Sequence, residues 1–140
     1  MSLMKVLKQI KRKYHFMIID SPPSITYDTI QIIKSSDKVF VPVQPSPLDL
    51  MATVPFLNLV RQERKKTTVI LNRVMPRAKL TEAMIMRLRY AGANIARSRI
   101  TGKIIYAETF SVGRGVVDIS VTSEASKEII KVGNEILRNF

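Results

Sequence analysis

Short apolar runs alternate with longer segments of helical periodicity, and this alternation constrains the fold of the chain more than any other feature. The clearest runs predict strands at residues 16–20, 39–43 and 67–73, and a weaker pattern predicts a fourth strand at 94–98. Runs that are apolar at nearly every position are typical of strands buried on both faces of a parallel sheet. Because helical segments follow the strands, we predict an α/β fold with a largely parallel sheet flanked by helices.

Apolar residues at helical spacing predict the helices that connect and follow these strands. The predicted helices cover residues 4–13, 25–35, 47–65, 81–91, 103–110 and 122–139. Ser24, Ser46 and Thr81 are the expected N-caps of three of them. Gly92 is expected to end the helix over 81–91, and Pro55 is expected either to bend the helix over 47–65 or to mark its true start.

The size and composition of the chain set limits on domain number and on the kind of site. The chain has 140 residues, 46% of them apolar, which suits one modest core. We assign a single domain to residues 4–140, since Met1-Ser2-Leu3 ahead of a second methionine resembles a short expression leader. No apolar run approaches the roughly 20 residues that cross a bilayer, so we expect a cytoplasmic protein without membrane insertion. With no cysteine and one histidine, the sequence excludes a disulfide framework and thiolate or histidine-cluster metal sites.

The formal net charge of +12 is unevenly distributed along the sequence. Residues 61–90 carry nine Lys or Arg against two acids, and residues 5–13 carry five against none, whereas residues 119–140 balance at three and three. A field of this sign attracts polyanions, so nucleic acid, anionic lipid and nucleotide phosphate are candidate partners. The alternative is a solvated basic surface that keeps the protein soluble.

Polar side chains follow the predicted strands at the edge where a ligand crevice is expected. Asp20 ends the first strand, Gln44 follows the second and Asn72 lies at the end of the third. Ligands of open parallel sheets bind beyond the carboxyl ends of the strands, so these three side chains are expected to converge. An aspartate in this position can hold Mg²⁺ through water in a nucleoside triphosphatase. The alternatives are that Asp20 caps the Ser-Pro-Pro turn and that Asn72 is a turn former.

Four successive blocks carry a resemblance to a known family. The blocks read IIDSPPS, SSDKVFVPVQPSPLDL, VILNRV and RSRITGKIIYAETFSVGRGVVD. In order and spacing they resemble the ParA/MinD family, the partition ATPases with a deviant P-loop, over nearly all of residues 4–140. The resemblance implies ATP and Mg²⁺ as cofactors, Asp20 as the Walker B aspartate acting on Mg²⁺ through water, Pro22 and Pro23 in the switch turn, and Asn72 at the adenine.

The sequence also departs from the family pattern. The phosphate loop Lys-Gly-Gly-x-Gly-Lys-Thr is absent, because none of the five glycines is paired and no Gly-Lys-Thr occurs. The chain therefore resembles the C-terminal portion of the family, an incomplete P-loop NTPase-like fold that lacks the P-loop strand. Without that strand, which the resemblance implies lies between the strands at 16–20 and 39–43, two inner edges are expected to be open. Thr101-Gly102 replaces the Pro-Arg of many relatives, which alters the implied adenine pocket.

The resemblance also gives the basic residues a role. It implies nonspecific DNA binding, with Arg87, Arg89, Lys103 and Arg114 at matching positions. The implied function is ATP-dependent DNA segregation by the complete protein, as a homodimer with a ParB-type or another small partition partner. We expect no ATP hydrolysis by this chain alone, since the lysines and backbone amides that stabilise phosphoryl transfer are missing. The alternative function is a non-catalytic basic module, from a truncated or split gene, that binds DNA or docks onto a complete ATPase.

Overall fold

The computed structural model describes residues 3–11, 13–22, 24–76 and 79–138. The chain divides into two compact units, Met1–Asp37 and Lys38–Phe140. The assignment of residues 4–140 to one domain stays a prediction. No helix in the described ranges combines the length and the apolar character needed to cross a membrane.

The described residues of the first unit form two helices, which are joined by an irregular segment. Helix α1 (Leu3–Lys11) and helix α2 (Tyr27–Ser35) have nine residues each. The start of α2 differs from the prediction, because the N-cap is Thr26, whose side chain accepts a hydrogen bond from the Thr29 N–H at 3.3 Å. Ser24 instead accepts a hydrogen bond from the Thr29 hydroxyl through its backbone oxygen, at 2.7 Å. The helix therefore begins two residues later than the sequence indicated.

The predicted strand at residues 16–20 is wrong. The segment has no regular secondary structure, and Phe16 and Ile18 are 57% and 95% exposed. An extended segment becomes a strand when a neighbouring backbone pairs with it. The sheet of the described residues contains three strands, all after residue 37, and residues 16–20 do not belong to it. The apolar pattern therefore does not by itself produce a strand here.

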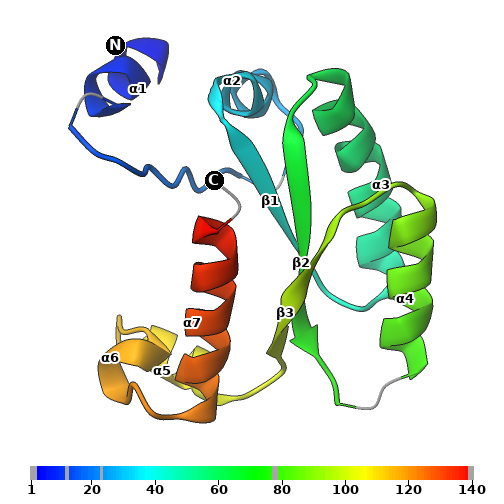
Figure 1. The fold of residues 1–140 in the computed structure, drawn as a ribbon, viewed down its shortest axis with the longest axis vertical. Helices are drawn as coiled ribbons and strands as arrows, with labels where there is room; N and C mark the ends of the chain where they lie inside the picture. Colours follow the sequence, from blue (N-terminus) through cyan, green and yellow to red (C-terminus); the bar gives the residue numbers. More distant parts are fainter. Residues whose placement is uncertain (1–2, 12, 23, 77–78, 139–140) are drawn as a thin grey trace. The chain divides into compact units, whose positions relative to one another are not determined.

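The second unit is built on a parallel sheet (Figure 1). Its strands are β1 (Lys38–Val43), β2 (Lys66–Val74) and β3 (Ile95–Thr101), in the spatial order β1-β2-β3. Both pairings are parallel, and the pairing of β2 with β3 contains two register shifts. The predicted α/β fold with a parallel sheet flanked by helices is confirmed.

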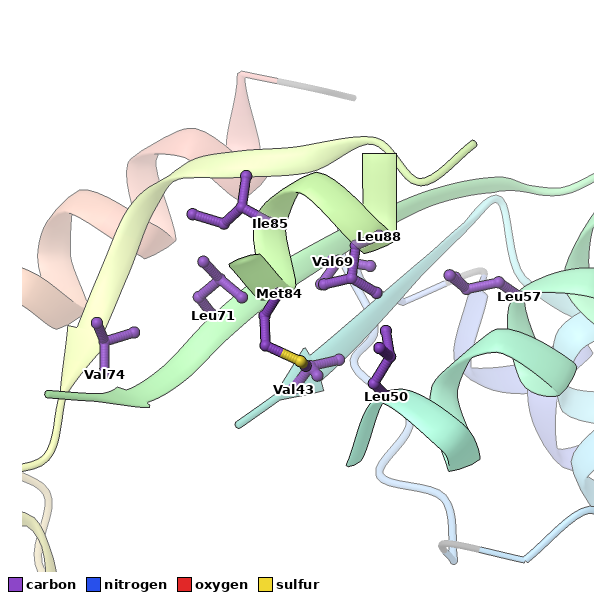
Figure 2. Packing of buried hydrophobic residues seen from close by; sticks show 9 residues of the cluster. All are labelled: Val43, Leu50, Leu57, Val69, Leu71, Val74, Met84, Ile85 and Leu88. Atoms are coloured by element: carbon purple, nitrogen blue, oxygen red, sulfur yellow. The ribbon is translucent and has the colours of Figure 1, made fainter. Parts of the chain in front are cut away.

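Helices cover both faces of this sheet. Helix α3 (Pro47–Gln62) and helix α4 (Lys79–Tyr90) pack on one face, and helix α7 (Glu124–Leu137) packs on the other (Figure 1). The short helices α5 (Ile105–Ser111) and α6 (Val116–Ile119) connect β3 to α7, and α6 was not predicted. Because side chains alternate along a strand, β2 contributes side chains to the cores on both faces of the sheet. Val69 and Leu71 belong to the core under α3 and α4, which Figure 2 shows. Ile70 packs with Val132 of α7 on the other face.

The ends of the helices test the predicted caps. Ser46 caps α3 and Pro47 occupies its first turn, as predicted, while the helix continues through Pro55. Gly92 follows α4 with φ at +77°, a conformation that suits glycine and ends the helix. Thr81 is not the cap of α4, because the helix begins at Lys79 and Thr81 lies inside it, 3% exposed. Its position on the buried side of the helix explains why it does not serve as a cap.

Candidate functional site

Asp20, Pro22 and Pro23 were predicted to form the Mg²⁺ side of a nucleotide site. Asp20 and Pro22 lie in the irregular segment of the first unit and are exposed, and Pro23 lies outside the described residues. Among the described residues no group of three or more His, Cys, Asp or Glu side chains gathers where a metal ion could be held. Mg²⁺ is usually held by one or two carboxylates together with waters and substrate phosphates, so Asp20 would supply only one part of such a site.

Asn72 lies in the second unit, near the carboxyl end of β2. Its side-chain oxygen accepts a hydrogen bond from the backbone N–H of Arg73 at 2.9 Å. Arg73 has φ at +52°, and the register of β2 with β3 shifts between Leu71 and Val74. Asn72 therefore stabilises a local irregularity of β2. This is the turn-forming role that the sequence offered as the alternative to an adenine contact. The adenine contact stays a prediction.

Gln44 follows β1 at the same end of the sheet as Asn72. Its backbone N–H donates to the Asp49 carboxylate at 2.9 Å, and the Ser46 hydroxyl donates to the same carboxylate at 3.1 Å. These contacts order the loop between β1 and α3. The 140 residues contain no Gly-Lys-Thr phosphate loop, so the residues present do not by themselves supply a cradle for the phosphates of ATP.

Arg87 and Arg89, two of the four predicted DNA contacts, lie in the last turn of α4 and are exposed. Neither has an ion pair with another described residue. The buried stripe of α4 contains Met84, Ile85 and Leu88. Residues two positions apart on a helix point about 200° apart, so Arg87 and Arg89 flank this stripe on opposite sides. The two arginines lie at the two borders of the exposed face of α4 and are available to anions.

Lys103 and Arg114 are the other two predicted DNA contacts. The ammonium group of Lys103 lies 2.6 Å from Glu128 Oε1 of α7, and the side chain of Lys103 is 35% exposed. Arg114 lies between α5 and α6, is exposed, and its backbone N–H donates to the Thr109 oxygen at 3.0 Å. Since Glu128 neutralises Lys103 locally, Arg114 is the more accessible of the two charges.

Glu128 is a polar centre that the sequence reasoning missed. Its carboxylate accepts hydrogen bonds from the Thr101 N–H at 3.0 Å, the Tyr106 hydroxyl at 2.7 Å and the Lys103 ammonium at 2.6 Å. Burial by itself would raise the pKa of Glu128, but these hydrogen bonds outweigh it and lower the pKa to about 2. The same contacts act on Tyr106, whose pKa is raised by burial and by the bond to Glu128.

Glu135 makes a similar contact two turns further along α7. Its two oxygens accept hydrogen bonds from the backbone N–H groups of Arg97 and Ser98, each at 2.7 Å. Burial would raise the pKa of Glu135, but the hydrogen bonds from Ser98 and Arg97 lower it overall. Glu128 and Glu135 are seven residues apart and therefore share one helix face, a spacing that could have indicated their common role. Both carboxylates tie α7 to backbone N–H groups of β3.

Comparisons with known proteins find a family model that matches half of the chain and relatives that match nearly all of it. The AAA_31 family, described as an AAA domain, matches residues 1–73. The maintenance of carboxysome distribution protein A of Halothiobacillus neapolitanus is 28% identical, over 94% of this chain and 64% of its own length. The sporulation initiation inhibitor protein Soj of Bacillus subtilis is 26% identical, over 98% of this chain and 57% of its own length. The chain thus spans 57–64% of the length of these two relatives.

Solved structures agree on the fold. The cell division ATPase MinD of Pyrococcus furiosus superposes with a TM-score of 0.80 at 20% identity, covering 97% of this chain and 57% of that one. The MinD cell division protein of Aquifex aeolicus gives a TM-score of 0.80 at 18% identity, covering 95% of this chain and 58% of that one. At this identity the likeness shows a shared fold, and the predicted ParA/MinD resemblance is confirmed by the two kinds of comparison together.

Proposed function

Because the chain belongs to the AAA-domain family and is ParA/MinD-like, we propose that it is part of a partition or positioning ATPase that moves or places DNA cargo. The observation that carries this proposal is the likeness to ParA-type relatives over nearly the whole chain, 94–98% of it in the two relatives above, together with the parallel sheet. The family implies the use of a nucleotide and Mg²⁺. In the complete protein, Asp20, Pro22 and Pro23 would lie toward the Mg²⁺ and the γ-phosphate, and Asn72 would lie toward the adenine.

The same proposal covers the partners. We assign nonspecific DNA, a ParB-type or another small partition partner, and a second copy of the complete protein. The charge of +12 supports the first of these, because a positive field favours a polyanion whatever its sequence. Arg87, Arg89 and Arg114 are exposed cations without an ion pair among the described residues, which supports their role in DNA binding.

A second candidate function is the non-catalytic basic module. It is favoured by the net charge of +12 and by the exposed side chains of Arg87, Arg89 and Arg114, which attract a polyanion without a nucleotide site. A module of this kind would bind DNA or a complete ATPase without turning over ATP. The two functions share DNA binding and differ in whether Asp20 contributes to catalysis once a phosphate loop is provided.

The DNA-binding part of the proposal is tested by the salt dependence of affinity. We expect the chain to bind a short labelled duplex without sequence preference, with an affinity that falls steeply as salt rises. Replacing both Arg87 and Arg89 with alanine should flatten the slope of log affinity against log salt by about two, since each neutralised phosphate contributes roughly 0.9. Fluorescence anisotropy at several salt concentrations measures both quantities.

The control for this experiment is Lys127→Ala. Lys127 is exposed and lies 2.7 Å from Glu124, so its charge is already paired on the protein surface. The variant removes a positive charge that Glu124 already neutralises. It should therefore keep the wild-type slope of log affinity against log salt. A double variant of Arg87 and Arg89 with an unchanged slope would show that these arginines are ordinary surface residues.

A further inference from the structure

Helix α4 has a second apolar stripe, on the side that faces away from the core. Its buried stripe anchors the helix in the core that Figure 2 shows. At about 100° per residue, the side opposite to the buried stripe is centred on Ala83, Met86 and Tyr90. All three are exposed, Met86 to 70% and Tyr90 to 97%. Their spacing of three and four residues makes them neighbours on one face of the helix.

Three cations surround this exposed stripe. Lys79 lies one turn before its first residue, and Arg87 and Arg89 border it on its two sides. None of the three has an ion pair with another residue in the described ranges. The one acid in the sequence of α4 is Glu82, whose carboxylate lies 3.3 Å from Nη1 of Arg99 and is therefore already paired. The stripe thus has positive surroundings.

We propose that the outer face of α4 docks an amphipathic helix of a partner protein, one whose apolar stripe is bordered by Asp and Glu side chains. The outer face consists of Lys79, Ala83, Met86, Arg87, Arg89 and Tyr90. The proposal goes beyond the proposed function, because that function assigns no protein partner to α4. The small side chain of Ala83 allows a partner helix to approach closely at the middle of the stripe.

The residue types of the outer face are those of protein interfaces. Aromatic residues, Met and Arg are enriched in interfaces relative to the rest of the protein surface. Tyr90 offers a large contact area and has only two side-chain torsions to order on binding. One exposed apolar residue is ordinary on a surface, but Met86 and Tyr90 lie four residues apart on one face between two arginines. This combination is typical of a contact surface.

The second unit holds the outer face in place. On the inner side of α4, Leu88 is fully buried and Met84 is 1% exposed. After the helix, Gly92 has φ at +77°, and Nη2 of Arg61 donates to the Ala91 oxygen at 2.7 Å. A preformed surface lowers the ordering cost of binding. The 12 residues of α4 extend over about 18 Å, which matches roughly three turns of a partner helix.

Charge and shape decide among the possible occupants. A second copy would bring the same cations and a net charge of +12 toward the outer face, and like charges oppose association. A helix that lies in a membrane surface inserts a broad apolar face, whereas the broad apolar face of α4 is turned toward the core. DNA would contact the cations but would leave Met86 and Tyr90 without apolar partners. A helix with acidic borders matches both the stripe and the cations.

The proposal is tested with a designed peptide. The probe is a labelled amphipathic helical peptide that carries leucines along one stripe and glutamates at both borders. The control peptide carries lysines in place of the glutamates. We expect the 140-residue chain to bind the acidic peptide and not the basic one, with an affinity that falls as salt rises. Fluorescence anisotropy at several salt concentrations measures both affinities.

Variants locate the contact on α4. Met86→Ala with Tyr90→Ala should weaken the affinity for the acidic peptide at least about tenfold, because these side chains are the apolar anchors. Arg87→Ala with Arg89→Ala should weaken it strongly at low salt and less at high salt. The matched control is Met51→Ala, since Met51 of α3 is 74% exposed, close to the 70% of Met86. All these side chains are exposed, so urea unfolding of each variant should resemble that of the wild type.

The outcomes separate this proposal from the proposed function. Equal affinity of the wild type and of Met86→Ala/Tyr90→Ala for the acidic peptide would overturn the docking site, whatever the result with DNA. Loss of duplex binding in Arg87→Ala/Arg89→Ala with unchanged peptide binding would also overturn it and would leave these arginines their DNA role. Peptide binding by a chain that binds no duplex at low salt would support the docking site and overturn the DNA part of the proposed function.

Two other occupants are tested directly. A dimer of the wild-type chain in sedimentation equilibrium, dissociated in Met86→Ala/Tyr90→Ala, would place a second copy on the outer face. Binding to vesicles that contain anionic phosphatidylglycerol, lost in the same variant, would place a membrane there. Either result would overturn the acidic helix as the occupant.

Discussion

At the scale of single residues, Gly92 occupies a position that other residues tolerate poorly. Its φ is +77°, and a Cβ atom added there would lie 2.8 Å from Nη2 of Arg61. That nitrogen donates to the Ala91 oxygen at 2.7 Å, so the guanidinium is held close to the turn. The glycine therefore serves both the backbone conformation and the approach of Arg61.

We predict that Gly92→Ala lowers the free energy of unfolding by about 1–2 kcal/mol, because a side chain in the left-handed region is strained. The matched control is Gly133→Ala. Gly133 lies inside α7, and a Cβ atom there would meet nothing within 4 Å. Alanine should stabilise that helix by roughly 0.5–1 kcal/mol. Urea unfolding of both variants measures the two changes, and equal effects of the same sign would contradict the interpretation.

Glu128 gives a second prediction at the residue scale. Its side chain is 18% exposed and accepts bonds from Thr101, Lys103 and Tyr106. Glu128→Gln should lower the free energy of unfolding by about 1–3 kcal/mol, because an amide cannot accept all of these donors. Glu124→Gln, which affects an exposed carboxylate paired with Lys127, should leave the free energy of unfolding nearly unchanged.

The pH dependence follows from the direction of the pKa shift. The pKa of Glu128 falls from 4.5 to about 2 in the folded chain. The carboxylate therefore stabilises the fold above the unfolded pKa, and this stabilisation is lost as pH falls through the window between the two values. Between pH 5 and pH 2 the wild type should lose more stability than Glu128→Gln, by about 3 kcal/mol at most. Parallel pH profiles of the two proteins would contradict this role.

At the scale of elements, the sequence predicted best where a pattern and a cap agree. Helix α3 begins at Pro47 after the Ser46 cap, and β1 and β2 match the predicted strands to within one residue at each end. The prediction failed at 16–20, because hydrophobicity specifies burial whereas a strand also requires a neighbouring backbone. Thr81 failed as a cap since the apolar spacing that makes α4 amphipathic places it on the buried side.

The candidate site was less predictable than the fold. The sequence shows which residues are basic, but it does not show which of them form ion pairs, because that depends on tertiary contacts. The ion pair of Lys103 with Glu128 is an example. The contacts between β3 and α7 join residues more than thirty positions apart, such as Arg97 and Glu135, and local patterns carry no information about such contacts. Only the seven-residue spacing of Glu128 and Glu135 hinted at a shared face of α7.

The orientation of α4 gives the prediction for this scale. Leu88 is fully buried in the core shown in Figure 2, whereas Met86 is 70% exposed on the same helix. Leu88→Ala should lower the free energy of unfolding by about 2–5 kcal/mol, because it leaves a cavity. Met86→Ala should change it by less than about 0.5 kcal/mol. If the two variants were equally destabilised, α4 would not present Arg87 and Arg89 in the way described.

At the scale of the whole molecule, the fold and the content of the sequence have to be considered together. The fold is that of MinD over 97% of the chain, and the sequence contains no phosphate loop. The family's chemistry depends on backbone amides and lysines that surround the transferred phosphate. The charge of +12 does not depend on that loop, so we predict that any DNA binding by this chain is independent of ATP hydrolysis.

The measurement that tests this account most directly is ATP turnover by the purified 140-residue chain with Mg²⁺, compared with Asp20→Ala and with a complete family member as the positive control. The account predicts no turnover above background in either form of the chain, because one exposed carboxylate cannot stabilise the charge of the transferred phosphate without a phosphate loop. Turnover by the wild-type chain that is abolished in Asp20→Ala would contradict it and would show that these residues already form a working site.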